Sequence, residues 1–238
     1  MIDEGNVLFM YAIAIDGPAG AGKSSVAKAA AKKLGFIYVD TGALYRTVGL
    51  YMLKNGIDLT NTEAVGGELK NISVKLSYEQ DGQHVFLNEE DVSSQIRTPE
   101  VSMAASTVSA IPLVRTFLFD LQQDLAKTNN VLMDGRDIGT VVLPHAQVKI
   151  FLTASAEERA RRRCLEFEQK GQPIKYEEVL ADIQKRDYQD SHREIAPLVP
   201  ADDAVIVDTS DCGLEETVER ILQIVYKKLP GCAIDFSH

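Results

Sequence analysis

Five short runs of apolar residues recur along the chain, and each ends in polar residues or in glycine. Val and Ile are frequent in these runs, and apolar and polar positions do not alternate cleanly within them. That pattern is typical of parallel strands that are buried on both faces of a sheet. The five predicted strands are Ala12–Asp16, Phe36–Asp40, Val131–Asp134, Val148–Thr153 and Ala204–Asp208.

Helical patterns lie between and after the predicted strands. The predicted helices are Ser24–Leu34, Ala43–Asn55, Leu113–Lys127, Ala156–Lys170, Tyr176–Glu194 and Leu214–Leu229. Strands that alternate with helices predict an α/β fold with an open, doubly wound, parallel five-stranded sheet. Such sheets bind their ligands over the carboxyl ends of the strands, where several of these runs place an aspartate.

Residues 66–98 interrupt the alternation of strands and helices. Positions over Ile72–Tyr78 follow a two-residue period, and Asp81-Gly82 is a hairpin signal. A second strand around His84–Leu87 and a third around Val92 would complete the unit. We therefore expect a small antiparallel β insertion, and neither a repeat nor a linker.

The segment Gly17–Ser24, GPAGAGKS, fits the pattern G-x-x-x-x-G-K-[ST] between the first predicted strand and the first predicted helix. The glycines let successive N–H groups converge on a phosphate, the lysine adds a cation, and the serine offers a hydroxyl to Mg²⁺. The pattern predicts a P-loop of the NTP hydrolase type that binds ATP with Mg²⁺; a glycine-rich turn without a ligand is the alternative. The expected ATP-binding residues are Gly17, Pro18, Ala19, Gly20, Ala21, Gly22, Lys23, Ser24 and Ser25, with Ser24 as the Mg²⁺ ligand.

Composition limits the partners of the chain. A formal net charge of −10 argues against nucleic acid, because a phosphate backbone would be repelled. No apolar stretch approaches the roughly 20 residues of a membrane span. The three cysteines lack the spacing of a metal site or a disulfide framework, and Met1–Gly5 carries acidic residues without a cationic run. We expect a cytoplasmic, monomeric protein with no nucleic-acid or membrane partner.

Two predicted strands lead into polar segments that suit an anionic ligand. After the second strand, Thr41 is a typical N-cap residue, and Arg46 lies about one turn into the helix that Thr41 would start. After the third strand, Asp134 suits the shell of Mg²⁺, Arg136 suits phosphate and Asp137 suits sugar hydroxyls. The alternatives are a solvated Arg46 on a capped helix, and a tight turn with a local Arg–Asp pair.

Arginines gather on one face of each of two successive predicted helices. The first helix carries Arg159, Arg162 and Arg163 at helical spacing. The second carries a comparable face, made of Arg186, Asp190 and Arg193. Joined by Gly171-Gln172-Pro173, the two helices would form a mobile lid that brings positive charge around a phosphoryl group and excludes water. A solvated charged face is the alternative.

A P-loop with an arginine lid suits phosphoryl transfer from ATP to a small acceptor. A hydroxyl acceptor would need a carboxylate base near the end of the second strand. A phosphate acceptor, whose second pKa is about 6, is already ionised and needs cations instead. The chain offers Arg46, Arg115, Arg136, Arg186 and Arg193 for that purpose, so a phosphate acceptor fits better.

Four segments together resemble the bacterial cytidylate kinase family of P-loop nucleoside monophosphate kinases. They are Gly17–Ser25, Asp40–Arg46, Asp134–Thr140 and Arg186–Ala201, and the resemblance extends from about Ile13 to Leu229. It implies phosphoryl transfer from ATP to CMP or dCMP, with Mg²⁺. It also implies a P-loop core (1–65, 108–154 and 195–238), an inserted monophosphate-binding domain (66–107) and an arginine-rich lid (155–194).

The resemblance also implies which residues act. CMP would be bound by Thr41, Arg46, Ser106, Arg115, Asp134, Arg136, Asp137, Arg186 and Asp190. The catalytic residues would be Lys23, Arg136, Arg159, Arg163 and Arg193. Ser106 and Arg115 fall in the base-reading stretch of the family, and Asp137 and Asp190 would meet the pentose.

Two positions depart from the family pattern, and other functions stay open. Thr41 stands where Ser is expected and keeps the hydroxyl, whereas Met103 stands where Asn is expected. One alternative is another small-molecule P-loop kinase, acting on UMP, AMP or a metabolite alcohol with Asp40 as the base. A nucleotide switch is a second alternative, although the chain lacks the N/T-K-x-D motif of a guanine switch.

Overall fold

The computed structural model describes residues 10–79, 82–169 and 171–230, and its main sheet has five parallel strands in the order β2-β6-β1-β7-β8. The strands are β1 (Ala12–Asp16), β2 (Ile37–Asp40), β6 (Val131–Gly135), β7 (Val148–Thr153) and β8 (Val205–Asp208). Every boundary lies within one residue of its predicted position, and the predicted doubly wound sheet is confirmed.

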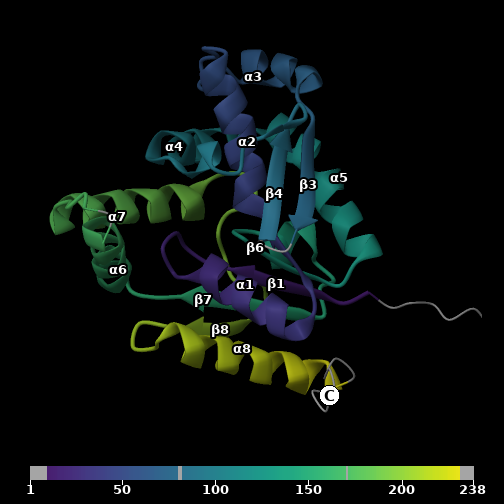
Figure 1. The fold of residues 1–238 in the computed structure, drawn as a ribbon, viewed down its shortest axis with the longest axis vertical. Helices are drawn as coiled ribbons and strands as arrows, with labels where there is room; N and C mark the ends of the chain where they lie inside the picture. The colour runs from purple at the N-terminus through teal and green to yellow at the C-terminus, as the bar shows by residue number, and fades with distance from the viewer. Residues whose placement is uncertain (1–9, 80–81, 170, 231–238) are drawn as a thin grey trace, which may run out of the picture.

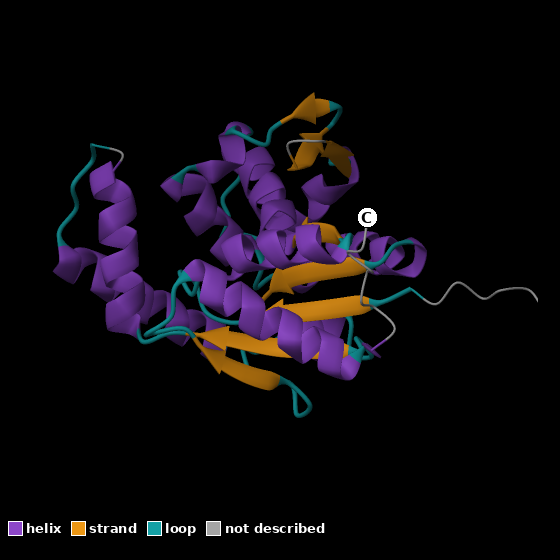
Figure 2. Cartoon of the chain, turned by 60° about the horizontal axis from the view of Figure 1, so that its bottom comes forward, coloured by secondary structure: helices purple, strands orange, loops and turns teal. Residues whose placement is uncertain are grey.

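Helices cover both faces of this sheet (Figures 1 and 2). On one face, α1 (Lys23–Leu34) and α8 (Leu214–Lys228) bury their apolar residues against strand residues such as Ile13 and Ile150. On the other face, α5 (Pro112–Thr128) packs together with a short π-helical turn, Ile138–Val142. The π-helical turn was not predicted from the sequence.

The register of the strands brings three aspartates to the same edge. Asp40 is the last residue of β2 and pairs in register with Asp134 of β6. Asp16, at the end of β1, pairs with Gly135. Three acidic side chains therefore end at the carboxyl edge of adjacent strands, directly beside the P-loop.

A second lobe stands above the carboxyl edge of the sheet (Figure 1). It holds α2 (Thr41–Lys54), α3 (Thr62–Glu68), α4 (Pro99–Val108) and a three-stranded antiparallel sheet, which together enclose a second apolar cluster. The small sheet consists of β3 (Val74–Glu79), β4 (Gly82–Leu87) and β5 (Glu90–Asp91). It confirms the expected β insertion, although the residues 80–81 of the predicted hairpin turn lie outside the described residues. Neither α3 nor α4 was predicted.

The helical hairpin α6 (Ala156–Gln169) and α7 (Tyr176–His192) projects from the other side of the carboxyl edge (Figure 1). Ala160, Val179 and Ile183 form a small apolar cluster between the two helices. The two predicted helices are confirmed there, and α7 ends two residues before its predicted end.

The predicted N-cap of α2 is wrong by one residue. Asp40 caps the helix, because its Oδ1 accepts the N–H of Ala43 at 3.0 Å, and Thr41 is already helical. The Thr41 hydroxyl instead donates to the backbone oxygen of Asp134 at 2.7 Å. Asp and Thr are both good N-cap residues. Asp40 is the cap here because the Thr41 hydroxyl is bound to the backbone of β6.

Within the described residues, no single helix has both the length and the apolar character needed to cross a membrane. Only α4 and α5 taken together reach that length and composition, and they are bent by 100° at their junction.

Candidate active site

The P-loop turns from β1 into α1 and leaves its backbone exposed to a cleft. Gly17 passes so close to β7 that a Cβ atom there would collide with the Leu152 carbonyl oxygen. Gly22 precedes α1 with a φ of 82°, a conformation that glycine adopts without strain. Glycine at these two positions therefore lets the loop curl in front of the helix N-terminus, where an anion is favoured.

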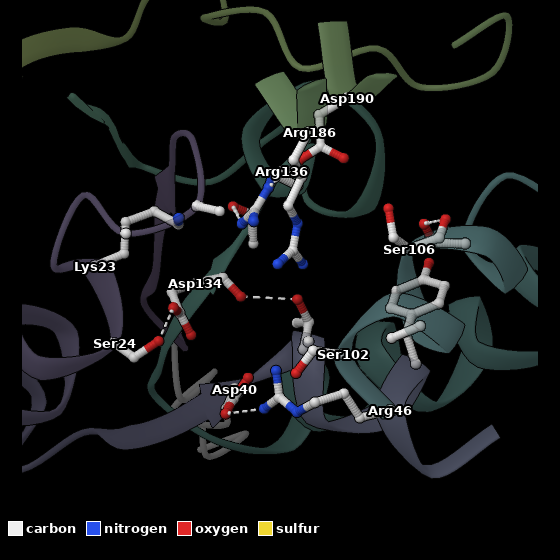
Figure 3. A pocket seen from close by; sticks show the side chains of 18 of the residues that line it. Lys23, Ser24, Asp40, Arg46, Ser102, Ser106, Asp134, Arg136, Arg186 and Asp190 are labelled. Carbon is white, nitrogen blue, oxygen red and sulfur yellow. Dashed lines mark hydrogen bonds and ion pairs between the residues drawn. The ribbon is translucent and has the colours of Figure 1, made fainter. Parts of the chain in front are cut away.

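Lys23 is the cation of this loop. Its side chain is buried, and Nζ donates to the Pro18 carbonyl oxygen at 2.7 Å, which holds the amine over the loop (Figure 3). Burial, together with the positive charge of Arg136, lowers the pKa of Lys23 below its usual value. A polyphosphate in the loop would supply the negative charge that the buried ammonium group lacks.

A carboxylate lies beside the Ser24 hydroxyl. Ser24 Oγ donates to Asp134 Oδ2 at 2.8 Å, and the Tyr38 hydroxyl donates to Asp134 Oδ1 at 3.0 Å. Burial and the nearby charge of Asp40 raise the pKa of Asp134. A buried carboxylate that is repelled by a second one, next to a hydroxyl and the P-loop, fits a hard divalent cation such as Mg²⁺.

A cation at this position would take most of its ligands from substrate and water, not from the protein. Among residues 10–79, 82–169 and 171–230, no group of three or more His, Cys, Asp or Glu side chains is placed to hold a metal ion. Mg²⁺ commonly binds through one or two protein groups, substrate phosphates and water. Ser24 and Asp134 could supply one or two such protein groups.

The acceptor side begins at Asp40 and Arg46 (Figure 3). Arg46 Nη2 donates to Asp40 Oδ2 at 2.8 Å. Asp40 is also the N-cap of α2, and its carboxylate accepts the N–H of Ala43. Arg46 Nε is buried and has no hydrogen-bond partner in the described residues. A buried donor of this kind is costly unless a ligand or water satisfies it, which makes the guanidinium group a candidate for anion binding.

A second arginine pair lies deeper on the acceptor side. Asp137 is buried between Arg115 Nη2, with which it is in close contact, and Arg193 Nη2, at 3.4 Å. Arg115 also stands 5.8 Å from the centre of the Tyr45 ring. This cluster presents an acceptor, several donors and an aromatic edge, which suits the polar edge of a planar base.

The lid contributes two more charged residues. Arg136 Nε donates to Asp190 Oδ2 at 2.8 Å, which ties the loop after β6 to α7. Burial and the neighbouring Arg136 lower the pKa of Arg186 to about 10, and among the described residues the buried Arg186 Nε has no hydrogen-bond partner. Like-charged guanidinium groups held close together indicate that an anion belongs between them.

The structure places Arg159 differently from the other lid arginines. Its guanidinium group makes two hydrogen bonds to Asp187 of α7 and one, of 3.0 Å, to the Ala19 carbonyl oxygen of the P-loop. The side chain is 4% exposed. Arg159 therefore braces the P-loop against the lid, with its charge already paired. Its predicted catalytic role stays a prediction.

One cleft of about 340 Å³ collects most of the expected site residues. Gly17, Pro18, Ala21 and Arg159 are the predicted residues that do not line it, and the first three lie in the P-loop itself. The residues that do line it come from the P-loop, the ends of β2 and β6, α2, α4, α5 and the lid: Ala19, Gly20, Gly22, Lys23, Ser24, Ser25, Thr41, Arg46, Ser106, Arg115, Asp134, Arg136, Asp137, Arg163, Arg186, Asp190 and Arg193.

The cleft also includes residues that sequence reasoning missed. They are Tyr45, Ser102, Ser109 and Glu166, and Arg162 was named only as part of the lid face. Ser102 and Ser106 of α4 and its C-cap residue Ser109 follow one another at spacings of four and three, so they lie on one side of the helix and its end. Thr98 followed by Pro99 was a signal for the start of this helix, and with it for the serine face.

Comparisons with known proteins agree with this geometry. A model of the cytidylate kinase family matches residues 13–227. The chain belongs to the cytidylate kinase family. Among its relatives, the cytidylate kinase of Carboxydothermus hydrogenoformans is 51% identical over 216 residues, covering 91% of this chain and 97% of the relative. That of Caldanaerobacter subterraneus subsp. tengcongensis is 52% identical over 219 residues, covering 92% and 96%.

A solved structure shows the same fold at low sequence identity. The crystal structure of an uncharacterized protein from Eubacterium ventriosum aligns with a TM-score of 0.50 and 12% identity, over 90% of this chain and 97% of that protein. The architecture of this cytidylate kinase family member is therefore found in a chain of quite different sequence.

Proposed function

We propose that this protein transfers the γ-phosphoryl group of ATP to the phosphate of CMP or dCMP, giving ADP and CDP or dCDP. The observation that carries the proposal is the arrangement of charge across the cleft. Lys23 and the P-loop lie at one end of the cleft and Arg46 lies at the other, and Arg136 and Arg186 reach the space between them from the loop after β6 and from the lid (Figure 3). Family membership and relatives named cytidylate kinase support the same reaction.

A phosphate acceptor suits this cleft better than an alcohol does. Asp40 is the residue that would serve as the base for an alcohol, and its two oxygens are already engaged by the Ala43 N–H and by arginine. An alcohol would have to displace one of these donors to reach the carboxylate. A phosphate monoester needs no base, and the surrounding guanidinium groups offset the repulsion between the two anions.

The donor half would work by positioning and charge. The backbone N–H groups of the P-loop and Lys23 would hold the β- and γ-phosphates of ATP. Ser24, with Asp134 beside it, would hold Mg²⁺, which when bound neutralises charge on the phosphate oxygens. Arg163 and Arg136 would face the group in transfer when the lid closes, which would also keep water away from it.

The acceptor half would contact the phosphate, the pentose and the base of CMP. Arg46 and Arg186 would bind its phosphate, and Asp190 would meet the pentose. The base would lie between the serine face of α4 and the cluster of Asp137, Arg115 and Arg193, where donors and an acceptor are already in place. For Asp137 and Arg193 this proposal differs from the roles expected from the family resemblance, because the two side chains pair with each other and with Arg115 in one cluster.

We also propose that the three predicted units have different roles in the reaction. The core (1–65, 108–154 and 195–238) would bind ATP, the inserted segment (66–107) would complete the acceptor site, and the lid (155–194) would close over both. A cytoplasmic location and a monomeric state stay predictions from the sequence.

A coupled assay of ADP release across several acceptors tests the proposed function. With ATP and Mg²⁺ present, we expect turnover with CMP and dCMP that far exceeds turnover with UMP, AMP or shikimate. Omission of Mg²⁺ should abolish it. Turnover with AMP or with an alcohol, but not with CMP, would instead favour another small-molecule P-loop kinase.

A further inference from the structure

Asp40 carries a second arginine partner that belongs to neither the P-loop nor the lid. Arg46 Nη2 and Arg97 Nη1 both donate to Asp40 Oδ2, at 2.8 Å and 3.2 Å. The other oxygen of Asp40 accepts the N–H of Ala43. One buried carboxylate is therefore shared by two guanidinium groups.

The position of Arg97 is fixed by its neighbours in the chain. Ile96 is fully buried in the apolar cluster of the second lobe. Thr98 is the N-cap of α4, and its hydroxyl oxygen accepts the N–H of Val101 at 3.2 Å. With both neighbours held, the backbone at Arg97 presents its side chain toward the end of β2, even though the side chain is 58% exposed.

The small sheet reaches the same residue from a second direction. The backbone N–H of Asp40 donates to Gln83 Oε1 of β4 at 2.9 Å. Two side chains of the inserted segment thus converge on Asp40, one on its backbone and one on its carboxylate. Asp40 is therefore one point, besides the cleft-lining serines of α4, at which the insertion contacts the acceptor side of the cleft.

The pairing of Asp40 with both Arg46 and Arg97 changes the net charge beside the proposed site of the acceptor phosphate. If Asp40 paired with Arg46 alone, the pair would be neutral overall. Two guanidinium groups on one carboxylate leave one net positive charge, and they also divide the attraction that holds Arg46 against Asp40. We propose that Arg97 is a positioning residue for the acceptor: by pairing with part of the Asp40 charge, it leaves more of the Arg46 charge available to the phosphate of CMP. This inference rests on the proposed function.

The competing interpretation is that the Arg97–Asp40 pair is a surface ion pair without a function, since exposed pairs contribute little to stability. The two interpretations differ in what they predict for binding. A net charge near the acceptor phosphate affects the KM for CMP in a way that depends on salt, because an exposed charge is screened at high ionic strength. A merely structural contact would change stability, and it would not produce a salt-dependent KM for one substrate alone.

The test compares three variants in steady-state kinetics. Arg97→Gln removes the charge and keeps a hydrogen-bond donor, and Arg97→Lys keeps the charge. Arg220→Gln is the matched control, because Arg220 is a half-exposed arginine, paired with Glu216 on the remote helix α8. KM and kcat are measured for CMP and for ATP at about 20 mM and about 300 mM salt, and the melting temperature of each variant is recorded.

At low salt, Arg97→Gln should raise the KM for CMP about three- to tenfold, with the KM for ATP and kcat within about twofold of the unsubstituted protein. The rise in KM should be smaller at high salt. Arg97→Lys should keep the KM for CMP close to that of the unsubstituted protein, and Arg220→Gln should not change it. A KM for CMP that stays within about twofold at low salt, or a rise shared equally by CMP and ATP, would overturn the role of Arg97. Absence of CMP-dependent turnover in the unsubstituted protein would reject the proposed function itself.

Discussion

At the scale of single residues, the cleft is organised by charges that are buried before any ligand arrives. Lys23, Asp134 and Arg186 all have shifted pKa values because burial disfavours their charged forms. Such groups are costly in the folded protein and become favourable when ions of opposite sign bind beside them. Lys23 and Arg186 therefore each lead to a distinct prediction.

Lys23→Ala should lower kcat about 10²- to 10³-fold, because the P-loop loses its only side-chain cation at the transferring group. Folding should remain intact, as shown by an unchanged circular dichroism spectrum. Lys33→Ala, at an exposed position in the last turn of the same helix, is the control and should keep full activity. Wild-type turnover by Lys23→Ala would show that the loop does not hold the phosphoryl donor as proposed.

Arg46→Ala and Arg186→Ala should act on the acceptor instead. We expect kcat/KM for CMP to fall about 10- to 100-fold, because each variant removes charge-assisted hydrogen bonds to the acceptor phosphate. ATP affinity, measured by calorimetric titration, should be nearly unchanged. If Arg46→Ala leaves the kinetics with CMP at wild-type values, the acceptor-side assignment is wrong.

Residue-level prediction from the sequence succeeded where the motif itself fixes the geometry. The P-loop residues Lys23 and Ser24 face the cleft as the spacing of the motif requires. Thr41 shows the limit: Asp40 and Thr41 are both acceptable N-cap residues, and only contact of the Thr41 hydroxyl with β6 decides between them. Arg97 gave no signal at all, because its partner Asp40 is 57 residues away in the sequence.

At the scale of elements, the turn after β6 depends on a buried aspartate. Asp16, at the end of β1, accepts the N–H groups of Ile138 and Gly139 at 2.8 Å and 2.7 Å and so fixes the start of the π-helical turn. Burial raises the pKa of Asp16 from 3.8 to about 6. The same turn directly follows Asp137, so Asp16 also fixes the backbone beside Asp137, the residue proposed to face the base.

The shift of Asp16 makes a prediction for stability against pH. Between the unfolded value of 3.8 and the folded value of about 6, the folded protein binds more protons than the unfolded chain does. The contribution of Asp16 to the free energy of unfolding should therefore rise as the pH falls through this range. Relative to Asp16→Asn, which does not titrate, wild-type stability should gain about 2–3 kcal/mol between about pH 7 and about pH 4.

Urea unfolding of both proteins at several pH values measures this difference. A difference in stability that does not change with pH would show that Asp16 has an ordinary pKa in the folded protein. A difference that falls toward acid would reverse the sign and contradict the account of its burial.

The lid offers a test of Arg159 as a brace. Arg159→Met should cost about 3 kcal/mol of stability, because it leaves Asp187 without its partner and breaks the contact with Ala19. Arg161→Met is the control on the same helix, since Arg161 is largely exposed and pairs only with Glu158 in the structure. Denaturant unfolding measures both. A large loss of kcat at unchanged stability would instead support the catalytic role expected from the family resemblance.

The elements that the sequence predicted well have a strong local signal. Buried parallel strands read as short apolar runs, and the helices α1, α5 and α8 carry clear periodicity. Helix α4 was missed because its serines suggested a ligand-binding stretch and hid the helical spacing. The π-helical turn was missed because it is held by Asp16, a tertiary contact that no local pattern encodes.

At the scale of the whole molecule, the cleft brings together parts of the chain that are far apart in sequence. The strand order β2-β6-β1-β7-β8 sets Asp40 beside Asp134, and the lid carries Asp190 to Arg136. Composition and alternation predicted the class of fold, but not which strand ends would be neighbours. The clustering of arginines could be expected from the need to join two anions, whereas their pairing with Asp40, Asp137 and Asp190 could not.

The central claim is that this cleft moves a phosphoryl group directly from one nucleotide to the other. A rapid-quench reaction with enzyme, Mg²⁺, CMP and ATP labelled in its γ-phosphate tests it. The account predicts that the label appears in the β-phosphate of CDP, in equal amount to the ADP formed, and only when CMP is present. Label released as inorganic phosphate at the same rate with and without CMP would contradict it.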